Sequence, residues 1–427
     1  MLKIAVAGLG TVGVGTINLL QKNADLITAR AGQPIAIRAV SARDKNRKRD
    51  CDLSGITWVD DPRQLASLPD IDVVVEVIGG AEGVVRELAE AALKNGKHYV
   101  TANKALLAAH GASLARLAEA NGVGLHYEAA VAGGIPIIKA LREGLAGNRI
   151  TSVRGIINGT CNYILTRMQD GNLAFDDVLK EAQDKGFAEA DPSYDIDGHD
   201  AAHKLALLTA LAFGVEPSPQ DIVIEGIRAL TSLDMMCADE LGYRIKLLGV
   251  TRRTEHGIQQ YVAPSLVTKG SMLANVRYAM NAVMIDGDAV GGLTLIGAGA
   301  GALPTGSAVV ADLVDIARGI RAPTFGLAAA ALSVPVRSTQ EDMTRFYIRL
   351  DAVNHSGVVA TIGAALADEG ISIASLVQRK KWERPDAMPI IITTEAVCPI
   401  NLRRAMGIVA ARPDVMLGKP CIMRIEG

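Results

Sequence analysis

The sequence lacks three features that mark specialised classes of protein. Its 427 residues contain no run of about 18 apolar residues, the length that a membrane-spanning helix needs. Its five cysteines (Cys51, Cys161, Cys237, Cys398 and Cys421) are odd in number, widely spaced and without a Cys-x-x-Cys pair, which argues against a disulfide framework and a zinc site. Lys and Arg total 44 against 46 for Asp and Glu, so the chain also lacks the basic excess of nucleic-acid-binding proteins.

These absences favour a cytoplasmic protein with small-molecule partners and no nucleic-acid or membrane partner. The first residues have the pattern of a strand that carries Lys3, and no long apolar core precedes a cleavage site of small residues. Cysteines without a pairing pattern fit a reducing compartment. The length predicts two or three domains.

The first 130 residues alternate short apolar runs with segments of helical length. The strand-like runs are Lys3–Ala7, Ile35–Val40, Asp72–Val77, His98–Thr101 and Val123–Tyr127. Apolar residues follow the 3.6-residue period of a helix in Thr11–Arg30, Glu82–Asn95 and Lys104–Asn121. Strands that alternate with helices predict an α/β fold with a doubly wound parallel sheet, here a Rossmann-type dinucleotide-binding domain over residues 1–130.

Two further domains are predicted. Residues 131–336 mix helices at Asp176–Lys185 and Gly198–Phe213 with strands near Ile150–Ile157 and Ile258–Val267, which predicts an α+β domain. After the polar, turn-rich segment Pro335–Asp342, residues 344–427 follow the order strand, helix, strand, strand, helix, strand. The corresponding segments are Arg345–Ala352, Val358–Glu369, Ile371–Gln378, Met388–Thr394, Leu402–Ala411 and Met416–Ile425, which predict a βαββαβ ferredoxin-like module.

A glycine-rich loop joins the first strand to the first helix. Gly8, Gly10 and Gly13 form G-x-G-x-x-G, with Thr11 and Val12 inside the motif. The triplet alone is a weak signal in a chain with 43 glycines, but its place between a strand and a helix is the one that a pyrophosphate site needs. The loop therefore predicts dinucleotide binding, with a tight turn that binds nothing as the alternative.

A second glycine cluster covers Gly297 to Gly306. It matches a G-x-G-x-x-A variant after a short apolar run, but no strand follows at the spacing of a βαβ unit. We therefore expect residues 297–320 to pack back on the cofactor domain, with Gly301 near the cofactor.

The end of the second strand bears on the choice between NADP and NAD. An NAD site places a carboxylate at this position, where it accepts hydrogen bonds from the ribose hydroxyls. In this chain the first charged residue after the strand is Arg43, and the segment Ser41–Asp50 holds further basic residues. A guanidinium suits a 2′-phosphate, which favours NADP over NAD. A solvated basic turn is the alternative, since Asp44 is adjacent.

The densest group of polar residues lies between Glu181 and Asp200, where seven carboxylates occur in 20 residues. Asp200 and Lys204 follow at helical i,i+4 spacing and therefore share one face. An exposed salt bridge is the simple interpretation, but the Ala- and Leu-rich continuation of the helix indicates burial. A buried lysine held by an aspartate is a candidate proton donor. The segment lacks EF-hand spacing and a zinc-type His pair, so the carboxylates favour a cationic substrate over a divalent metal.

Two more residues are candidates for chemistry. Lys104 follows a strand and so lies at the carboxyl edge of the sheet, where ligands of open α/β folds bind; a lysine that only begins a helix is the alternative. Cys161 is a candidate thiol nucleophile that would form a thioester. No partner histidine is identifiable near it, and small buried cysteines are common.

Several segments together resemble homoserine dehydrogenases with a C-terminal module similar to an ACT domain. They are GLGTVGVG, TANK, EAAVAGGIPII, GIINGTCNYIL, GFAEADPSYDIDGHDAAHKLALL and GAGAGALPTGSAVVADL, which span nearly the whole chain. The resemblance implies reversible, NAD(P)-dependent interconversion of L-homoserine and L-aspartate 4-semialdehyde, a step toward threonine, methionine and isoleucine. It also implies that residues 131–336 bind the substrate and form a dimer. One alternative is a catalytically silent regulator that binds a dinucleotide and an amino acid, and another is a semialdehyde dehydrogenase that acts through Cys161.

The resemblance also implies roles for individual residues. Lys204 would donate a proton to the aldehyde oxygen, Asp200 would orient Lys204, and Lys104 would lie between the nicotinamide and the substrate. The substrate's polar end would meet Glu189 and Asp195, on the segment that begins at Gly186. A sodium ion is implied on Glu128, Val131, Gly133 and Ile135, and oxygen ligands at a glycine-rich turn suit such a hard cation.

The C-terminal module departs from the ACT pattern at one turn. After the first strand the family has aspartate, any residue, proline and glycine, whereas this chain has Asn354, His355, Ser356 and Gly357. If threonine or another amino acid of the pathway binds to the module, a coupling of about 1 to 3 kcal/mol suffices for feedback control. A purely structural role in forming a homodimer or homotetramer is the alternative.

Overall fold

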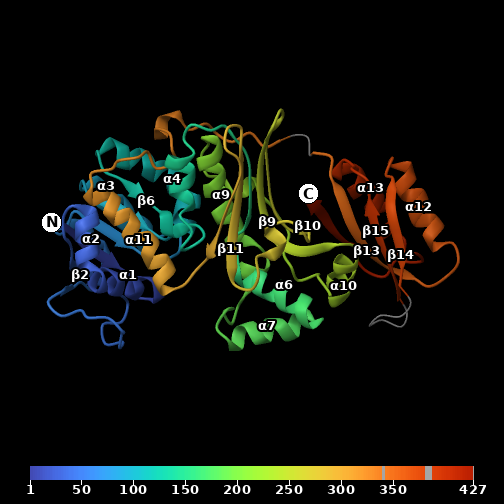
Figure 1. Cartoon of the computed structure of the whole chain (residues 1–427), viewed down its shortest axis with the longest axis horizontal. Coiled ribbons are helices and arrows are strands. Elements are labelled where there is room, and N and C mark those ends of the chain that lie inside the picture. The colour runs from blue at the N-terminus through green and yellow to red at the C-terminus, as the bar shows by residue number, and fades with distance from the viewer. Residues whose placement is uncertain (339–341, 380–386, 427) are drawn as a thin grey trace.

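The structure is a computed structural model that describes residues 1–338, 342–379 and 387–426. The chain forms three parts in a row, with the N-terminal part at one end of the long axis and the C-terminal part at the other (Figure 1). Residues 339–341 of the turn-rich segment Pro335–Asp342 lie outside the described residues.

The N-terminal part is built on a parallel sheet with the strand order β3-β2-β1-β4-β5-β6. The strands are β1 (Leu2–Ala7), β2 (Ile35–Ser41), β3 (Thr57–Trp58), β4 (Val73–Glu76), β5 (His98–Thr101) and β6 (Leu125–His126). This order confirms the predicted Rossmann-type fold. The two-residue strand β3 was not predicted, because it is too short to show a pattern.

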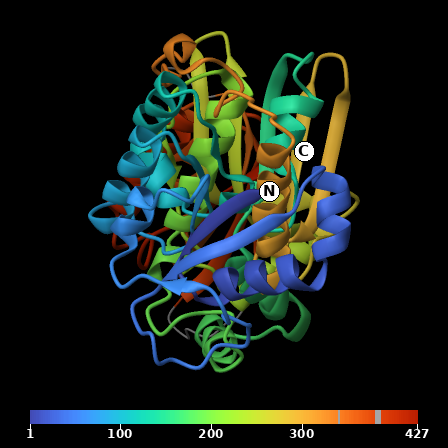
Figure 2. The same ribbon diagram turned by 90° about the vertical axis from the view of Figure 1, so that its left-hand side faces the viewer.

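Helices cover both faces of this sheet. In β1, Ile4 and Val6 face one core together with residues of α1 (Thr11–Lys22) and α11 (Ala302–Ala317), while Ala5 and Ala7 face the other core together with α3 (Val84–Lys94) and α4 (Lys104–Ala120). The alternation follows from the two-residue period of a strand. Figure 2 shows α11 beside the N-terminal helices, so a segment from the middle of the chain completes the cofactor domain.

The predicted helix over Thr11–Arg30 is wrong as a single element. It is two helices, α1 and α2 (Ala24–Ala31), separated at Asn23, whose backbone is not helical (φ −110°, ψ 26°). Asparagine favours helix ends because its side chain competes for backbone hydrogen bonds. The break lets α2 turn and contact α11.

A mixed sheet runs through the other two parts of the molecule. Its strand order is β12-β11-β7-β9-β10-β16-β13-β15-β14, with β8 also pairing with β10. The strands are β7 (Ile150–Ile156), β8 (Val223–Ile224), β9 (Tyr243–Thr254), β10 (Gly257–Thr268), β11 (Met280–Gly287), β12 (Gly291–Ala298), β13 (Arg345–Val353), β14 (Ile373–Gln378), β15 (Ala387–Thr394) and β16 (Cys421–Glu426). The order β16-β13-β15-β14 confirms the ferredoxin-like module.

The C-terminal module is joined to the middle part by a continuous sheet. Strand β16 pairs in parallel with β10, so that Ser265 lies opposite Arg424 and Val267 opposite Glu426. Buried Asp234 adds a second link, because it accepts hydrogen bonds from the Tyr347 hydroxyl and the Arg349 guanidinium, both at 2.9 Å. The module is therefore attached by main-chain pairing and buried polar contacts, which the spacing of the segments does not reveal.

The predicted final strand starts too early. The strand is β16, and it begins at Cys421 instead of Met416. Gly418 has a positive φ of 96°, and Pro420 has no N–H to donate to a ladder, so the residues before Cys421 do not continue a regular strand.

The remaining helices carry the polar residues of the middle part or cover the C-terminal sheet. They are α5 (Ile137–Lys139), α6 (Gly159–Gly171), α7 (Phe175–Asp184), α8 (Ser193–Ile196), α9 (His199–Phe213), α10 (Ser232–Glu240), α12 (Val358–Asp368) and α13 (Pro399–Ala410). Short turns of other helix types include η2 (Glu128–Ala130) and η5 (Leu273–Asn275). Among the described residues, no helix combines the length and apolar character needed to cross a bilayer.

Candidate active site

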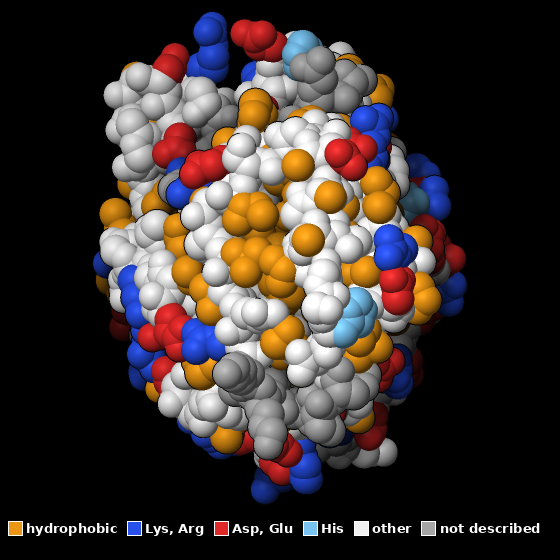
Figure 3. Space-filling model, turned by 90° about the vertical axis from the view of Figure 1, so that its right-hand side faces the viewer, with side chains coloured by type: hydrophobic (Ala, Val, Ile, Leu, Met, Phe, Trp, Pro, Cys, Tyr) orange, Lys and Arg blue, Asp and Glu red, His pale blue; other side chains and the backbone are white. Residues whose placement is uncertain are grey.

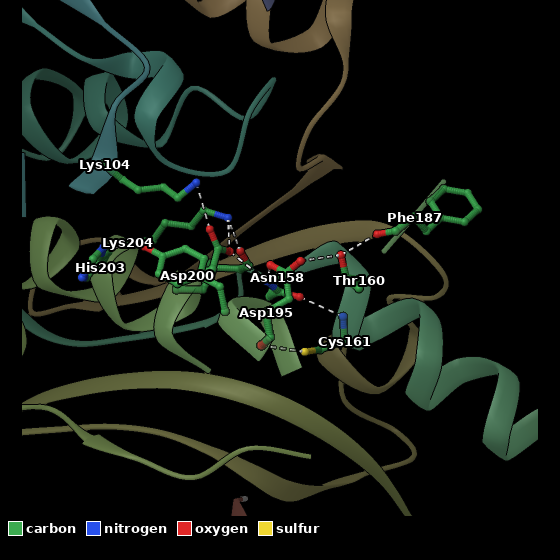
Figure 4. A network of polar contacts seen from close by, with 11 residues as sticks. Lys104, Asn158, Thr160, Cys161, Phe187, Asp195, Asp200, His203 and Lys204 are labelled. Carbon is green, nitrogen blue, oxygen red and sulfur yellow. Dashed lines mark hydrogen bonds and ion pairs between the residues drawn. The ribbon is translucent and has the colours of Figure 1, made fainter. Parts of the chain in front are cut away.

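Three charged side chains from two domains meet at one point. Lys204 and Asp200 share a face of α9, and the Lys204 ammonium lies 2.7 Å from Asp200 Oδ2. Lys104, the first residue of α4 in the cofactor domain, lies 3.0 Å from Asp200 Oδ1. Figure 4 shows both ammonium groups pointing at the same carboxylate. The pair that looked like an ordinary i,i+4 salt bridge is thus a three-membered cluster at the junction of two domains.

The Asp200 carboxylate is ionised in this cluster. Its side chain is 6% exposed, and burial alone would raise its pKa. The charges of Lys204 and Lys104 outweigh that effect and hold the pKa of Asp200 well below its ordinary value. Lys204 also donates to the Ile157 carbonyl oxygen at 2.9 Å. An ammonium has three N–H groups, so Lys204 keeps one for a ligand oxygen.

Asn158 connects the cluster to the neighbouring helix. It is the N-cap of α6, where its Oδ1 accepts from the Cys161 amide at 2.8 Å. Its Nδ2 donates both to Asp200 Oδ2, at 2.8 Å, and to Asp195 Oδ1, at 2.7 Å. Sequence reasoning missed this residue, although an asparagine between a strand and a helix is a common N-cap signal.

Asp195 lies on the short helix α8, beside Asp200 of α9. Burial raises the pKa of its carboxyl, and the charge of Asp200 raises it further. The Thr160 hydroxyl lies 3.3 Å from Asp195 Oδ2 and donates to the Phe187 carbonyl oxygen at 2.8 Å. Thr160 therefore ties α6 both to Asp195 and to the loop that follows α7, and it too was missed from the sequence.

Cys161 has the environment of a structural cysteine. It is fully buried, and its thiol donates to the Asp195 carbonyl oxygen at 3.2 Å. Burial, together with the charges of Asp195 and Asp200, raises the pKa of the Cys161 thiol well above its ordinary value. Since the thiolate is the nucleophilic form, this geometry disfavours the semialdehyde dehydrogenase hypothesis.

Lys104 is held in place by the start of its helix. Asn103 caps α4 through the Leu106 amide (3.1 Å) and donates to the Gly80 carbonyl oxygen (2.7 Å). Buried Glu76, at the end of β4, accepts from the Thr101 hydroxyl at 2.7 Å and from the amides of Ile78 and Gly79. An ammonium at a helix N-terminus is electrostatically unfavourable, and the contact with Asp200 offsets that cost.

Glu189 and Gly186 lie on the loop between α7 and α8. Both are exposed, and Gly186 has a positive φ of 74° where α7 ends. The Glu189 carbonyl oxygen accepts from Gln183 Nε2 at 3.1 Å. Its carboxylate makes no hydrogen bond or ion pair with any described residue, so no direct contact joins Glu189 to the lysine cluster.

The glycine loop has the geometry that a dinucleotide needs. A Cβ at Gly13 would lie 2.0 Å from the Gly8 carbonyl oxygen, and one at Gly8, where φ is 104°, would lie 2.7 Å from the Val77 oxygen. At Gly10 the space is open. Thr11 and Val12 form the first turn of α1, which holds no acidic residue. The loop therefore leaves room beside Gly10 for a phosphate group that the first amides of α1 can bind.

Arg43 lies just beyond β2 and is exposed. Arg49, which was not singled out from the sequence, folds back on the glycine loop: it donates to the Leu9 carbonyl oxygen at 3.4 Å and stacks over Trp58, 5.4 Å from the ring centroid. The basic segment is thus anchored beside the loop, and Arg43 remains open to solvent.

Gly301 is the N-cap residue of α11 and has a φ of 121°. A Cβ at Gly306 would lie 3.0 Å from the Gly15 carbonyl carbon, and one at Gly15 would lie 2.2 Å from the Ala302 oxygen. The glycines therefore let α11 approach α1 at backbone distance. This contact places Gly301 beside the cofactor domain.

The proposed cation residues lie between β6 and α5. The Glu128 carboxylate is buried and accepts from the Ile138 and Lys139 amides, both at 2.9 Å. Each oxygen keeps a further lone pair. Ala132 and Gly133 have positive φ values of 56° and 53°, which make a tight turn over Val131–Ile135. No cluster of three or more His, Cys, Asp or Glu side chains suited to a metal occurs among the described residues, so a cation here would depend on backbone oxygens.

Three family models match consecutive parts of the chain. The models are the NAD-binding domain of homoserine dehydrogenase (residues 8–128), homoserine dehydrogenase (residues 136–314) and the ACT domain (residues 346–414). A curated homoserine dehydrogenase from Pseudomonas aeruginosa is 46% identical over 431 aligned residues, which cover 99% of this chain and 98% of the relative. The chain belongs to the homoserine dehydrogenase family. The predicted family, its enzyme class of oxidoreductases and the ACT domain are thereby confirmed.

Solved structures agree with this assignment. The crystal structure of a homoserine dehydrogenase from Thiobacillus denitrificans has a TM-score of 0.92 and 45% identity, and the match covers 100% of this chain and 98% of that one. A hyperthermophilic archaeal homoserine dehydrogenase in complex with NADPH matches 74% of this chain and 97% of its own, with a TM-score of 0.62 and 26% identity.

The divergent turn of the ACT domain is closed by His355. Its Nε2 lies 2.6 Å from the Asp414 carbonyl oxygen, and its Nδ1 lies 2.7 Å from the Ser356 oxygen. These carbonyl oxygens raise the pKa of His355. Gly357 keeps the left-handed backbone that opens α12, with a φ of 94°.

Proposed function

We propose that this enzyme interconverts L-homoserine and L-aspartate 4-semialdehyde with NAD(P), as a step in the biosynthesis of threonine, methionine and isoleucine. The observation that carries the proposal is the Lys204 ammonium, which is 12% exposed, paired with Asp200 and left with one N–H for a ligand. We further propose that residues 1–130 bind the cofactor, residues 131–336 bind the substrate and form the dimer, and residues 344–427 regulate.

Lys204 acts as the proton donor when the aldehyde is reduced. The bound nicotinamide supplies the hydride for the aldehyde carbon. The oxygen gains negative charge at the same time, and the Lys204 ammonium stabilises that charge and transfers a proton to it. Asp200 holds the Lys204 ammonium in place through their hydrogen bond, and Lys104 brings a second positive charge from the cofactor side.

Acidic residues receive the substrate's own ammonium group. Asp195 lies next to Asp200, and its oxygens are oriented by Asn158 and Thr160. The Glu189 carboxylate has no partner among the described residues and lies on the loop that begins at Gly186, so it is available to the substrate. A cationic ligand would lower the raised pKa of Asp195, which favours binding of the charged amine.

NADP is the preferred cofactor in this proposal, because Arg43 stands free at the tip of β2. We expect Arg43→Ala to raise the KM for NADPH about tenfold or more and to leave the KM for NADH within twofold, because only NADPH carries the 2′-phosphate. Equal weakening of both cofactors would refute the phosphate assignment.

A monovalent cation, sodium in this proposal, binds at the turn of Glu128, Val131, Gly133 and Ile135. Its test is the melting temperature of the chain in sodium chloride against tetramethylammonium chloride at equal ionic strength. A saturable rise with sodium that Glu128→Gln reduces supports the site, and identical melting in both salts would contradict it.

The ACT domain binds threonine in this proposal, and the chain forms a homodimer or homotetramer. Strand β14 is one of the two edges of the long sheet, and an exposed edge invites pairing with a second chain. Figure 3 shows hydrophobic side chains gathered in the middle of the outer face of this end of the molecule. Exposed apolar residues of the module include Ile373, Leu376, Ile400 and Ile408. Light scattering that gave the mass of one chain would contradict the oligomer.

The decisive experiment follows NADPH absorbance with L-aspartate 4-semialdehyde as substrate, with and without threonine. Consumption of NADPH that depends on the aldehyde supports the proposed reaction, and inhibition by threonine supports feedback. A protein that binds NADPH but leaves it unoxidised would instead be the catalytically silent regulator.

A further inference from the structure

A second buried lysine in the middle part has no carboxylate partner. Lys246 lies on β9 and is 3% exposed. Its ammonium donates to Asn162 Oδ1 at 3.0 Å and to the Val276 carbonyl oxygen at 2.5 Å. Neither acceptor is charged, and the third N–H has no partner among the described residues. Burying an ammonium is costly unless a counter-charge offsets it.

Lys246 lines a small cavity between α6, β9 and η5. The cavity volume is about 70 Å³, and its lining includes Gln169, Asp170, Arg244, Lys246, Asn275 and Arg277. Three of these residues are cations and one is an acid. The side chains of Arg277 and Asp170 are 50% and 29% exposed and form an ion pair, so this end of the cavity lies at the surface of the molecule.

The nearby carboxylates are committed to other partners. Asp170 forms an ion pair with Arg277 and accepts from the Tyr278 hydroxyl at 3.4 Å. Asp239 is shared by two cations, because it pairs with Arg244 and also with Lys269, at 3.0 Å. Four cations thus face two acids in this region, which leaves a net charge of +2, and Lys246 is the one of the four cations without an ion pair among the described residues.

The charge of Lys246 persists at neutral pH. Burial lowers its pKa to about 8, the positive charges of Arg277 and Arg244 contribute in the same direction, and the charge of Asp170 opposes them. The ammonium form therefore still predominates at pH 7. Gln169 Oε1, in the same lining, is buried without a hydrogen-bond partner among the described residues, and as an acceptor it can bind a water molecule or the O–H of a hydrogen phosphate.

We propose that this cavity binds a small oxyanion of the size and charge of inorganic phosphate. The anion accepts the free N–H of Lys246 and is flanked by the guanidinium groups of Arg244 and Arg277. A volume of about 70 Å³ corresponds to about two water molecules, which suits a compact oxyanion and excludes a nucleotide. The site is separate from the proposed reaction and does not depend on it.

Bound anion would also strengthen the support of the catalytic helix. Lys246 contacts Asn162, one turn after Asn158, the residue that orients Asp195 and Asp200. Asn162 in turn donates to the Val276 and Met280 carbonyl oxygens. The cavity therefore lies against the same helix, α6, whose N-terminus carries the substrate-facing groups.

The test is a titration of the full chain with potassium phosphate at constant ionic strength, followed by the melting temperature and by calorimetry. We expect a saturable stabilisation of the wild type. Lys246→Met should weaken phosphate binding at least tenfold, because it removes a charge-assisted hydrogen bond. Lys269→Met, a neighbouring cation outside the cavity lining, serves as the matched control and should bind phosphate within twofold of the wild type.

Two outcomes would overturn the proposal. One is the absence of saturable phosphate binding in the wild type. The other is unchanged binding in Lys246→Met, which would place the phosphate elsewhere, for example on the glycine loop. If Lys246→Met fails to fold, Arg277→Gln at the rim replaces it, with the same tenfold loss expected and unchanged binding again counting against the site.

Discussion

Lys204 and Lys246, two lysines of the middle part with little solvent exposure, differ in their counter-charge. Each donates to a main-chain carbonyl oxygen, but Lys204 also contacts the Asp200 carboxylate, whereas Lys246 contacts the neutral amide of Asn162. Lys204 is one of two cations on a buried acid, and Lys246 is one of three cations around a cavity with one acid. The comparison teaches that the partners of a buried lysine, rather than burial alone, distinguish the role in catalysis that we propose for Lys204 from the anion binding that we propose for Lys246.

The largest effect is expected at Lys204. Lys204→Met should lower kcat by about 10² to 10⁴, because the variant loses its general acid while the glycine loop is unchanged. The measurements are steady-state kinetics and NADPH binding by fluorescence. Lys180→Met, on the exposed surface of α7, is the control and should keep full activity. A Lys204→Met enzyme with kcat within twofold of the wild type would end the assigned role.

The next largest effect is a loss of stability on removal of the Asp200 carboxylate, the counter-charge of the two lysines. Asp200→Asn leaves two ammonium groups without their buried carboxylate, and breaking such a buried pair costs about 3 to 5 kcal/mol. Chemical denaturation should show this loss of stability. Adding Lys104→Met to Asp200→Asn should recover part of it, because one uncompensated charge is removed. A double variant no more stable than Asp200→Asn would contradict the three-membered cluster.

Lys246 should make the stability of the chain depend on pH, because its folded-state pKa of about 8 lies below the ordinary value of 10.5. Folding therefore disfavours the proton on Lys246, and this penalty disappears as the pH rises from 8 to 10.5. The stability of the wild type relative to Lys246→Met should rise across that window by about 3 kcal/mol, at about 1.4 kcal/mol per pH unit. Denaturation curves at several pH values in phosphate-free buffer provide the check, and a flat difference would refute it.

The smallest effect comes from supplying Lys246 with a carboxylate. Gln169→Glu keeps the shape of a residue in the cavity lining and adds a negative charge there. The variant should gain about 1 kcal/mol of stability in phosphate-free buffer and lose its response to phosphate, so that Lys246 becomes paired as Lys204 is. Gln64→Glu, at an exposed position of the cofactor domain, is a control for the added charge. Full retention of the phosphate response would count against the cavity site.

Local patterns made much of the fold predictable. The alternation of strands and helices in the first 130 residues and the order of segments after Arg345 depend on periods of two and 3.6 residues, which are visible in any short window. Asp200 and Lys204 were found for the same reason, since four residues along a helix place two side chains on one face. The break at Asn23 and the late start of β16 were missed because both depend on single residues at element ends.

Contacts between distant segments were not predictable in this way. Asn158 meets Asp195 and Asp200 across 37 and 42 positions, and Lys246 meets Asn162 across 84. The pairing of β10 with β16 joins segments more than 150 positions apart. No local period encodes such neighbours.

The sequence by itself determined the types of element, the glycine loop and the candidate proton donor, because these depend on neighbours within one turn or one strand. Only the tertiary structure decided the charge state that each buried group can hold. Electrostatic energies depend on distance in space and on burial, so the second lysine on Asp200 and the missing carboxylate at Lys246 became visible only once the chain was folded.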